Sequence, residues 1–242
     1  METVDRMLAT MRSAFGAMGR RGGRWIDRDG VGAVVMPSVP DRSVVNAVIY
    51  ERGADVEAAY DELESLYTGV NAWTVWVPEE DAATAEMLAA RGHSLDANPL
   101  MMVLDLAGFE PPAELPDDRT AVTTHRMGQI NDAAYPWHDG SFERAMHGAL
   151  SPEDFHVYAT ENACVLGIHD CGGDAGVFFV ATLPEARGRG LARGLLAAAL
   201  VDARERGCDI STLQATKAGA PVYERLGYRS FGAIGMWEKR RP

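Results

Sequence analysis

A basic, glycine-containing turn between a strand and a helix is the part of this sequence best suited to bind an anion. Residues 177–183 are almost wholly apolar and rich in β-branched and aromatic types, which predicts a strand covered on both faces. Gly188 and Gly190 follow it and, lacking a Cβ, can take positive φ and let a ligand approach the main chain. A helix is predicted over 191–206, and its first N–H groups have no partner inside the helix. The pattern predicts a phosphate site, and arginines at the same turn add positive charge in a chain of net charge -12: Arg187, Arg189 and Arg193.

Two familiar phosphate-binding motifs do not fit this turn. Gly188, Gly190 and Gly194 approach the Gly-x-Gly-x-x-Gly pattern of dinucleotide folds, but the expected acidic residue after a second strand is missing. A nucleoside-triphosphate loop would need Gly-Lys-Ser/Thr, which is also missing here. The turn therefore indicates a phosphate ligand of another kind than those bound by these two motifs.

The segment resembles the Arg/Gln-x-x-Gly-x-Gly/Ala signature of the GNAT superfamily of N-acetyltransferases, filled here by Arg187, Gly190 and Ala192. Further along the chain, 211–216 is similar to the next strand of that family. Residues 220–228 are similar to its short helix ending in Tyr-x-x-Leu-Gly-Phe/Tyr. Order and spacing agree from about residue 119 to the C-terminus. The resemblance implies an α/β GNAT fold with a mixed sheet and acetyl-coenzyme A as co-substrate.

The resemblance also assigns roles to residues around the turn. The end of the 177–183 strand matches the segment whose backbone pairs with the pantetheine arm, and the turn matches the pyrophosphate loop. The residues carried over as cofactor-binding are Val180, Ala181, Thr182, Arg187, Gly188, Arg189, Gly190, Leu191 and Ala192. Thr216 stands where many relatives have an asparagine that contacts the cofactor, and a hydroxyl can replace an amide as donor.

Tyr223 is the residue that we expect to be catalytic. A phenol can hydrogen-bond a leaving thiolate and supply its proton, and the family commonly places a tyrosine at this helix position. The alternative is that the ring only packs. For the acceptor, the resemblance places Tyr135, Trp137 and His138 in a loop that borders the acceptor pocket. Glu161 lies near the cofactor strand and is a further substrate or base candidate.

The general base is left open by the sequence. Glu161, His169 and Asp170 lie on or beside the strands before the cofactor strand, and each is also an ordinary turn residue in such a place. No histidine forms a ligand pair at metal spacing, so we expect no metal. Three cysteines at irregular spacing fit neither a disulfide framework nor a zinc site.

Two similar halves are predicted on either side of a proline-rich, acidic linker over 109–118. Residues 119–242 form the GNAT acetyltransferase domain. Residues 1–108 repeat the order of strand, short helix, glycine and final strand, the last one over 100–106. Their turn at 51–54 has one glycine and one arginine, a poor anion site, so we expect a degenerate GNAT-like domain without an acetyl-coenzyme A site. An unrelated α/β domain is the alternative.

Composition narrows the class of protein further. At 242 residues and 47% hydrophobic residues, the chain can form real cores. No apolar run approaches the ~18 residues that a membrane span needs, and no signal sequence is recognisable, so we expect a cytoplasmic protein without a membrane partner. The acidic net charge argues against nucleic acid as a partner. We expect a monomer or homodimer.

These observations predict an N-acetyltransferase that transfers an acetyl group to the primary amine of a small molecule or amino-acid-like metabolite. Two alternatives stay open. The same fold could sense an acyl-coenzyme A without turnover, or the acceptor could be a protein or peptide amine. The intact turn together with Tyr223 favours an enzyme, because a sensor has no need for an acid at the thiolate. The acceptor is set by loops that vary freely on a fixed scaffold.

Overall fold

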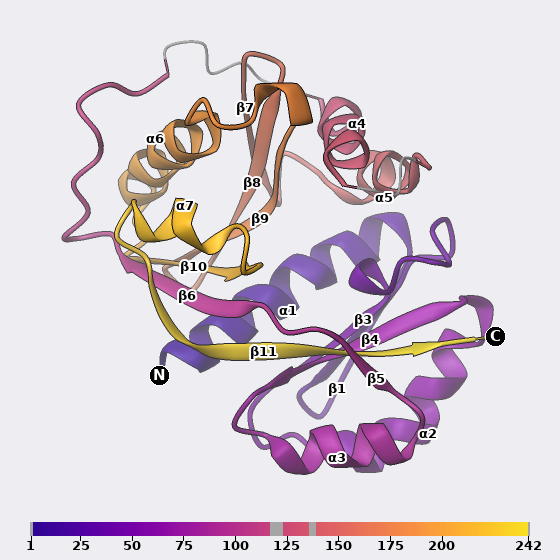
Figure 1. Ribbon diagram of the computed structural model, residues 1–242. Coiled ribbons are helices and arrows are strands. Elements are labelled where there is room, and N and C mark those ends of the chain that lie inside the picture. The colour runs from indigo at the N-terminus through magenta and orange to yellow at the C-terminus, as the bar shows by residue number, and fades with distance from the viewer. Residues whose placement is uncertain (1, 117–122, 136–138, 242) are drawn as a thin grey trace.

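The computed structural model describes residues 2–116, 123–135 and 139–241. Within these ranges, eleven strands form one mixed sheet (Figure 1). Their bounds are β1 (Arg24–Arg28), β2 (Val31–Val35), β3 (Ala47–Tyr50), β4 (Ala72–Pro78), β5 (Ser94–Ala97), β6 (Leu100–Asp105), β7 (His156–Thr160), β8 (Cys164–Cys171), β9 (Asp174–Thr182), β10 (Ile210–Ala215) and β11 (Arg229–Arg240). The order across the sheet is β1-β2-β3-β4-β11-β6-β10-β9-β8-β7, and β5 pairs with β11. The parallel pairs are β3 with β4 and β9 with β10.

Helices cover both faces of the sheet. Their bounds are α1 (Thr3–Gly22), α2 (Val56–Leu66), α3 (Ala82–Ala90), α4 (Thr124–Ala134), α5 (Ser141–Ala149), α6 (Leu191–Glu205) and α7 (Ala220–Glu224), with short 3-10 turns η1 (Ser43–Val45), η2 (Tyr67–Gly69) and η3 (Pro184–Ala186). On one face, α1, α4 and α5 share a single core with strands of both halves. On the other face, α6 and α7 pack on the C-terminal strands, and α2 and α3 on the N-terminal strands. None of the helices in the described ranges is long and apolar enough to cross a membrane.

Most elements lie where the sequence predicts them. The apolar run at 177–183 lies in β9, and the helix predicted over 191–206 is α6, whose inward residues Leu195, Leu196 and Leu200 are fully buried. The helix ends before Gly207, which takes a φ of +99°. The mixed α/β fold class is therefore confirmed, with the turn of interest between β9 and α6.

The two halves exchange strands. β6 precedes the linker in sequence, yet it pairs antiparallel with β10 of the C-terminal half, with Leu213 opposite Met102. β11, the C-terminal strand, pairs with β6 through its first residues and with β4 and β5 of the N-terminal half through its last ones. Figure 1 shows β11 running the length of the junction. The sheet is thus continuous across the two halves, and neither half completes its sheet from its own sequence segment alone.

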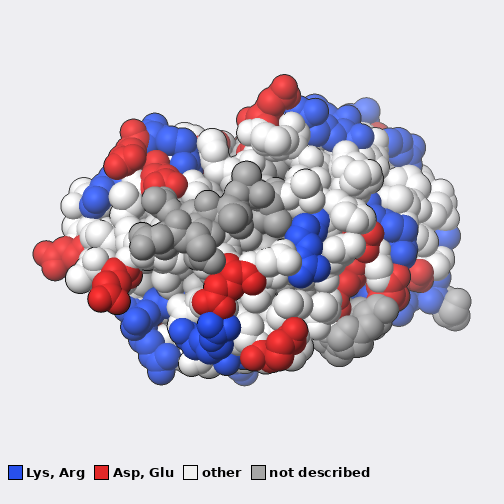
Figure 2. All heavy atoms as spheres, turned by 90° about the horizontal axis from the view of Figure 1, so that it is seen from above, with Lys and Arg blue, Asp and Glu red and all other residues white. Residues whose placement is uncertain are grey.

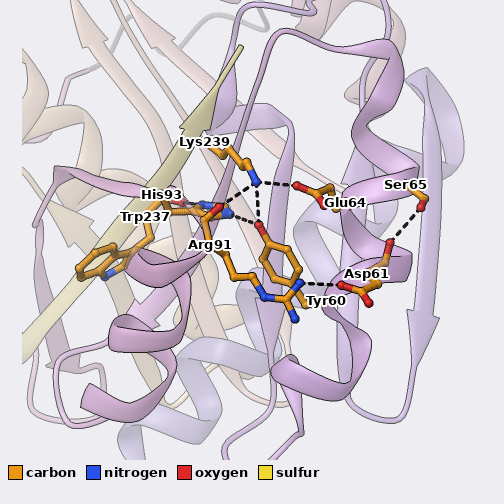
Figure 3. A network of polar contacts seen from close by, with 8 residues as sticks. All are labelled: Tyr60, Asp61, Glu64, Ser65, Arg91, His93, Trp237 and Lys239. Atoms are coloured by element: carbon orange, nitrogen blue, oxygen red, sulfur yellow. Dashed lines mark hydrogen bonds and ion pairs between the residues drawn. The ribbon is translucent and has the colours of Figure 1, made fainter. Parts of the chain in front are cut away.

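A buried polar network holds the end of β11 to the N-terminal half (Figure 3). The Nζ of Lys239 donates to the hydroxyl of Tyr60, which lies 3.0 Å from Nε2 of His93. The Nδ1 of His93 donates to the carbonyl oxygen of Trp237, 2.9 Å away. Since a carbonyl only accepts, Nε2 is the nitrogen that accepts from Tyr60. Lys239 also forms an ion pair with Glu64 of α2. The imidazole of His93 thus links Tyr60 of α2 to Trp237 of β11.

Helix α1 and the β2–β3 loop make further polar contacts between the halves. Asp174, fully buried at the start of β9, accepts hydrogen bonds from Thr10 of α1 and Thr212 of β10. Arg42 of the β2–β3 loop donates to the hydroxyl of Ser141 at the start of α5 and pairs with Asp139 at 2.8 Å. The N-terminal half thereby contacts the helix pair α4 and α5 beside the region where the acceptor site is predicted.

Candidate active site

The strands β9 and β10 separate beyond their first residues. Their parallel pairing covers only Asp174–Gly176 with Ile210–Thr212. In the remainder of β9 a bulge interrupts the pairing with β8, and Phe179 there has a φ of +55°. A non-glycine residue in this conformation is uncommon, and bulges often re-aim groups near active sites. Past Gly176, β10 therefore does not pair with β9 within the described residues, which leaves room for an extended ligand along this edge.

The bulge directs two carbonyl groups of β9 towards α4. The amide of Asn131, a buried residue of α4, donates to the carbonyl oxygen of Phe179 at 3.3 Å. The hydroxyl of Tyr135 donates to the carbonyl oxygen of Val180 at 3.4 Å. Neither Asn131 nor the bulge stands out in the sequence, because nothing local in the sequence marks a positive φ at a phenylalanine.

The turn after β9 has the main-chain geometry that its glycines predict. Gly188 and Gly190 have φ values of +78° and +80°, and a Cβ at either position would meet no atom within 4 Å. The glycines are therefore needed for backbone conformation and not for lack of space. Within the described residues, no backbone acceptor bonds the N–H groups of 188–193, which surround the start of α6. Such a set of free N–H groups at a helix N-terminus suits a phosphate.

The arginines of the turn are partly engaged within the protein. Arg187 donates to the carbonyl oxygens of Thr182, at 3.3 Å, and of Ala134, at 2.6 Å, so it ties the turn to the end of α4. Arg189 forms an ion pair with Glu161 at 2.7 Å. Seen from above, acidic and basic residues alternate over the surface instead of forming a single basic field (Figure 2). In this structure the main chain supplies the free donors of the turn, and the arginines mainly shape it.

Tyr223 lies half-buried on α7, with its ring edge-on to Tyr228 at a centroid distance of 6.0 Å. Its hydroxyl has no hydrogen-bond partner within the described ranges. Burial raises the pKa of Tyr223 well above its ordinary value, and the neighbouring Tyr135 and Cys164 add to the shift. A phenol with a raised pKa stays protonated and can donate.

The other predicted residues are distributed around this centre. Ala181 is buried, and Thr182 donates to the sulfur of Cys164 at 3.2 Å. The hydroxyl of Thr216 accepts from the N–H of Gly219, so its oxygen already caps the turn before α7. Leu191 and Ala192 form the first turn of α6 and contact its core. Trp137 and His138 lie outside the described residues.

The candidates for a general base form their contacts with residues other than Tyr223. Glu161 has a φ of +51° in the β7–β8 turn, where it meets Arg189 of the predicted pyrophosphate loop. His169 is buried between the carbonyl oxygen of Asp154 and the hydroxyl of Ser13, and Asp170 pairs with Arg206. These contacts give His169 and Asp170 structural partners. Among the described residues, no group of three or more His, Cys, Asp or Glu is arranged to hold a metal ion.

The corresponding place in the N-terminal half is closed. β3 and β4 are parallel neighbours like β9 and β10, and their pairing also covers few residues, Ala47 and Val48 with Thr74 and Val75. At the end of β3, however, the buried Tyr50 donates to the carboxylate of Asp81, at 2.7 Å, which also caps α3. Burial and this hydrogen bond raise the pKa of Tyr50. A side chain thus joins the end of β3 to the start of α3, beside the end of β4.

Comparisons with known proteins agree with this geometry. Residues 151–230 match the family model of the GNAT acetyltransferase domain, a span that includes β9, the turn, α6, β10 and α7. No curated protein matches the sequence.

Solved structures share the fold over nearly the whole chain. A GCN5-related N-acetyltransferase from Kribbella flavida is 18% identical, with 96% of this chain and 95% of that one covered and a TM-score of 0.68. One from Sphaerobacter thermophilus is 17% identical, with 99% and 92% covered and a TM-score of 0.58. A tandem GNAT protein from the clavulanic acid biosynthesis pathway is 14% identical, with 87% and 78% covered and a TM-score of 0.56.

The prediction of a GNAT fold with two GNAT-like halves is confirmed by these structures. At such low identity they show the fold alone, and the assignment to a family rests on the match of the C-terminal half. Residues 151–230 therefore match a GNAT acetyltransferase domain, and both halves of the chain share a GNAT-like fold.

Proposed function

We propose that this protein is an acetyl-coenzyme A-dependent N-acetyltransferase that acetylates the primary amine of a small molecule or amino-acid-like metabolite. One observation carries the proposal. The gap between β9 and β10 leads to N–H groups at residues 188–193, and Tyr223 lies on α7 beside the same strands. Neither these N–H groups nor the Tyr223 hydroxyl have a hydrogen-bond partner in the described part of the chain. These features support donor binding and proton supply within one half of the molecule.

The residues of the turn fit the charged part of acetyl-coenzyme A. Its pyrophosphate suits the N–H groups of 188–193, because Gly188 and Gly190 leave the main chain open to close approach. Its pantetheine arm suits the edge of Val180, Ala181 and Thr182 on the β10 side, because β9 pairs with β10 only through Asp174–Gly176. These are hydrogen bonds from backbone to ligand, so they depend on strand geometry more than on side-chain identity.

Acetyl-coenzyme A supplies an acetyl group on a thioester, which an amine can take up by replacing the thiolate. Tyr223 keeps its proton at neutral pH because burial raises its pKa, and it can give this proton to the sulfur that leaves. Tyr135 fixes the end of α4 to the carbonyl of Val180, and Arg187 fixes it from the other side through Ala134. The end of α4, where we propose that the amine binds, is therefore attached to β9, the strand that we propose holds acetyl-coenzyme A.

The N-terminal half completes the sheet and supports the acceptor side without binding acetyl-coenzyme A. Two observations support this division of roles, under which residues 1–108, 109–118 and 119–242 are the degenerate half, the linker and the catalytic half. The bond between Tyr50 and Asp81 closes the N-terminal counterpart of the β9–β10 gap. Arg42 contacts Ser141 and Asp139 at the start of α5. The N-terminal half thus contacts the region where we propose that the acceptor binds.

Calorimetric titration with acetyl-coenzyme A tests the proposal first. We expect one site per chain. Replacement of Tyr223 by Phe should leave this affinity within about twofold and lower turnover, measured as free thiol released with a panel of primary amines, by about 100-fold, within the range of a general acid. Two sites per chain would contradict the assignment of the N-terminal half. Binding without thiol release for any amine would instead favour an acyl-coenzyme A sensor.

A further inference from the structure

The N-terminal half contains a cavity of about 340 Å³ that lies apart from the residues of the proposed active site. It is bounded by the end of β4, by α3, and by β5 and β11. The alanine side of α3 forms one wall, with Ala85 and Ala89, and Leu95 and Trp237 of the two strands form another. A volume of this size is in the range of small-molecule sites.

The exposure of a large apolar side chain at this cavity is unusual for the molecule. Leu95 is 50% exposed and is, with Tyr135, one of two large hydrophobic side chains left exposed within the described residues. Leu88 is the one residue of α3 that is fully buried, and Ala85 and Met87 pack against the N-terminal core while partly exposed, so the small side chains of the helix leave space beside the sheet. The half that has lost the phosphate turn therefore keeps an apolar hollow of its own.

The charges around the cavity have one sign. Its lining includes the acidic residues Glu79, Asp81 and Glu86 and no lysine, arginine or histidine. Asp81 is bound by Tyr50 and by the N–H of Thr84, whereas Glu79 and Glu86 form no ion pair within the described ranges. The indole of Trp237 adds an aromatic face, which attracts cations. Carboxylates over an apolar floor complement a molecule with an apolar body and a positive charge.

We propose that this cavity binds small organic ammonium ions with an aromatic or aliphatic body. The apolar body packs against Ala85, Leu95 and Trp237, and the ammonium group lies toward Glu79 and Glu86. The cavity shares β11 with the C-terminal half, because the strand pairs with β6 through its first residues and carries Trp237 in its later part. This site is separate from the acceptor site of the proposed reaction, and the inference does not depend on that reaction.

Nuclear magnetic resonance of the full-length protein, labelled with ¹⁵N at tryptophan and free of acetyl-coenzyme A, tests the proposal. The Trp237→Phe variant identifies the indole signal of Trp237. The probes are 2-phenylethylamine, its neutral counterpart 2-phenylethanol and the anion 3-phenylpropionate. We expect a saturable shift of the Trp237 signal, with the amine bound about fivefold to tenfold more tightly than the alcohol, as partly exposed ion pairs allow, and with the anion weakest.

Two variants locate the charge and the cavity. The double variant Glu79→Gln, Glu86→Gln should remove the preference for the amine and leave the affinity for 2-phenylethanol unchanged. Ala89→Phe should fill the cavity and abolish binding of both, whereas Ala90→Phe, its exposed neighbour outside the cavity, is the matched control and should bind normally. A Trp237 signal that does not move with the amine, or a preference that survives loss of both carboxylates, would overturn the proposal. A shift of other tryptophans alone would place amine binding elsewhere.

Discussion

The buried imidazole of His93 should make the free energy of unfolding depend on pH, and the substitution His93→Gln should remove this contribution. Burial is the main reason that its pKa is lowered from 6.5 to about 4, and the ammonium group of Lys239 lowers it further. Protonation at Nε2 would place a second donor against the hydroxyl of Tyr60, which already receives a hydrogen bond from Lys239. The folded state therefore resists the proton that the unfolded chain accepts readily.

The magnitude follows from the two pKa values. Above pH 6.5 His93 is neutral in both states, and its network contributes fully to stability. As the pH falls from 6.5 towards 4, the unfolded state binds the proton first, so stability is lost. Between pH 7 and pH 5, the pKa difference corresponds to a loss of about 2 kcal/mol in the free energy of unfolding, at about 1.4 kcal/mol per pKa unit.

The wild-type protein alone cannot reveal this loss, because Asp174 changes stability in the opposite sense. Burial raises the pKa of Asp174 from 3.8 to about 6, so its contribution is greatest at low pH and is lost as the pH rises through 6. Urea unfolding of the wild type and of His93→Gln at pH 7 and pH 5 separates the two. Asp174 and all other groups act alike in both proteins and cancel in the difference.

We expect the stability advantage of the wild type over His93→Gln to be about 2 kcal/mol smaller at pH 5 than at pH 7. Glutamine can keep one hydrogen bond of the network but does not titrate. An advantage that is the same at both pH values would refute the reasoning, since it would mean that His93 takes up a proton equally easily in the folded and unfolded states. The slope of the urea transition serves as control, because an unchanged slope shows that the same surface is exposed on unfolding.

Three further substitutions test other parts of the structure. Asp174→Asn should show the opposite pH dependence in the same urea assay: the advantage of the wild type should grow by about 1 kcal/mol from pH 7 to pH 5, and a constant difference would contradict the burial argument. Gly190→Ala should cost about 1 kcal/mol of stability for its positive φ and weaken acetyl-coenzyme A binding about tenfold by calorimetry; full affinity would exclude the turn as the phosphate site. Arg42→Met should lower the free energy of unfolding by about 1–3 kcal/mol, because it leaves Ser141 and Asp139 without their buried partner. A loss within error would show that the contact between the halves is weak.

Local sequence signals predicted the elements around the candidate site well. Gly188 and Gly190 have the positive φ that their type permits, and the apolar run of β9 and the leucine stripe of α6 are buried as their periodicity indicates. Each of these signals depends on residues close together in the chain. The same local reading gave no sign of the bulge at Phe179, because a phenylalanine has no intrinsic preference for that conformation and the surrounding strands impose it.

The sequence by itself determined that a β-strand runs into a glycine turn and a helix N-terminus, and thereby where we propose that a phosphate binds. Only the tertiary structure decided which residues meet there. Tyr135 reaches Val180 and Arg187 turns to Ala134 because α4 packs against β9 from a distant part of the chain. The exchange of β6 and β11 has the same origin. Strand pairing depends on edges that become available only when both halves are folded, and no pattern within one segment specifies its partner.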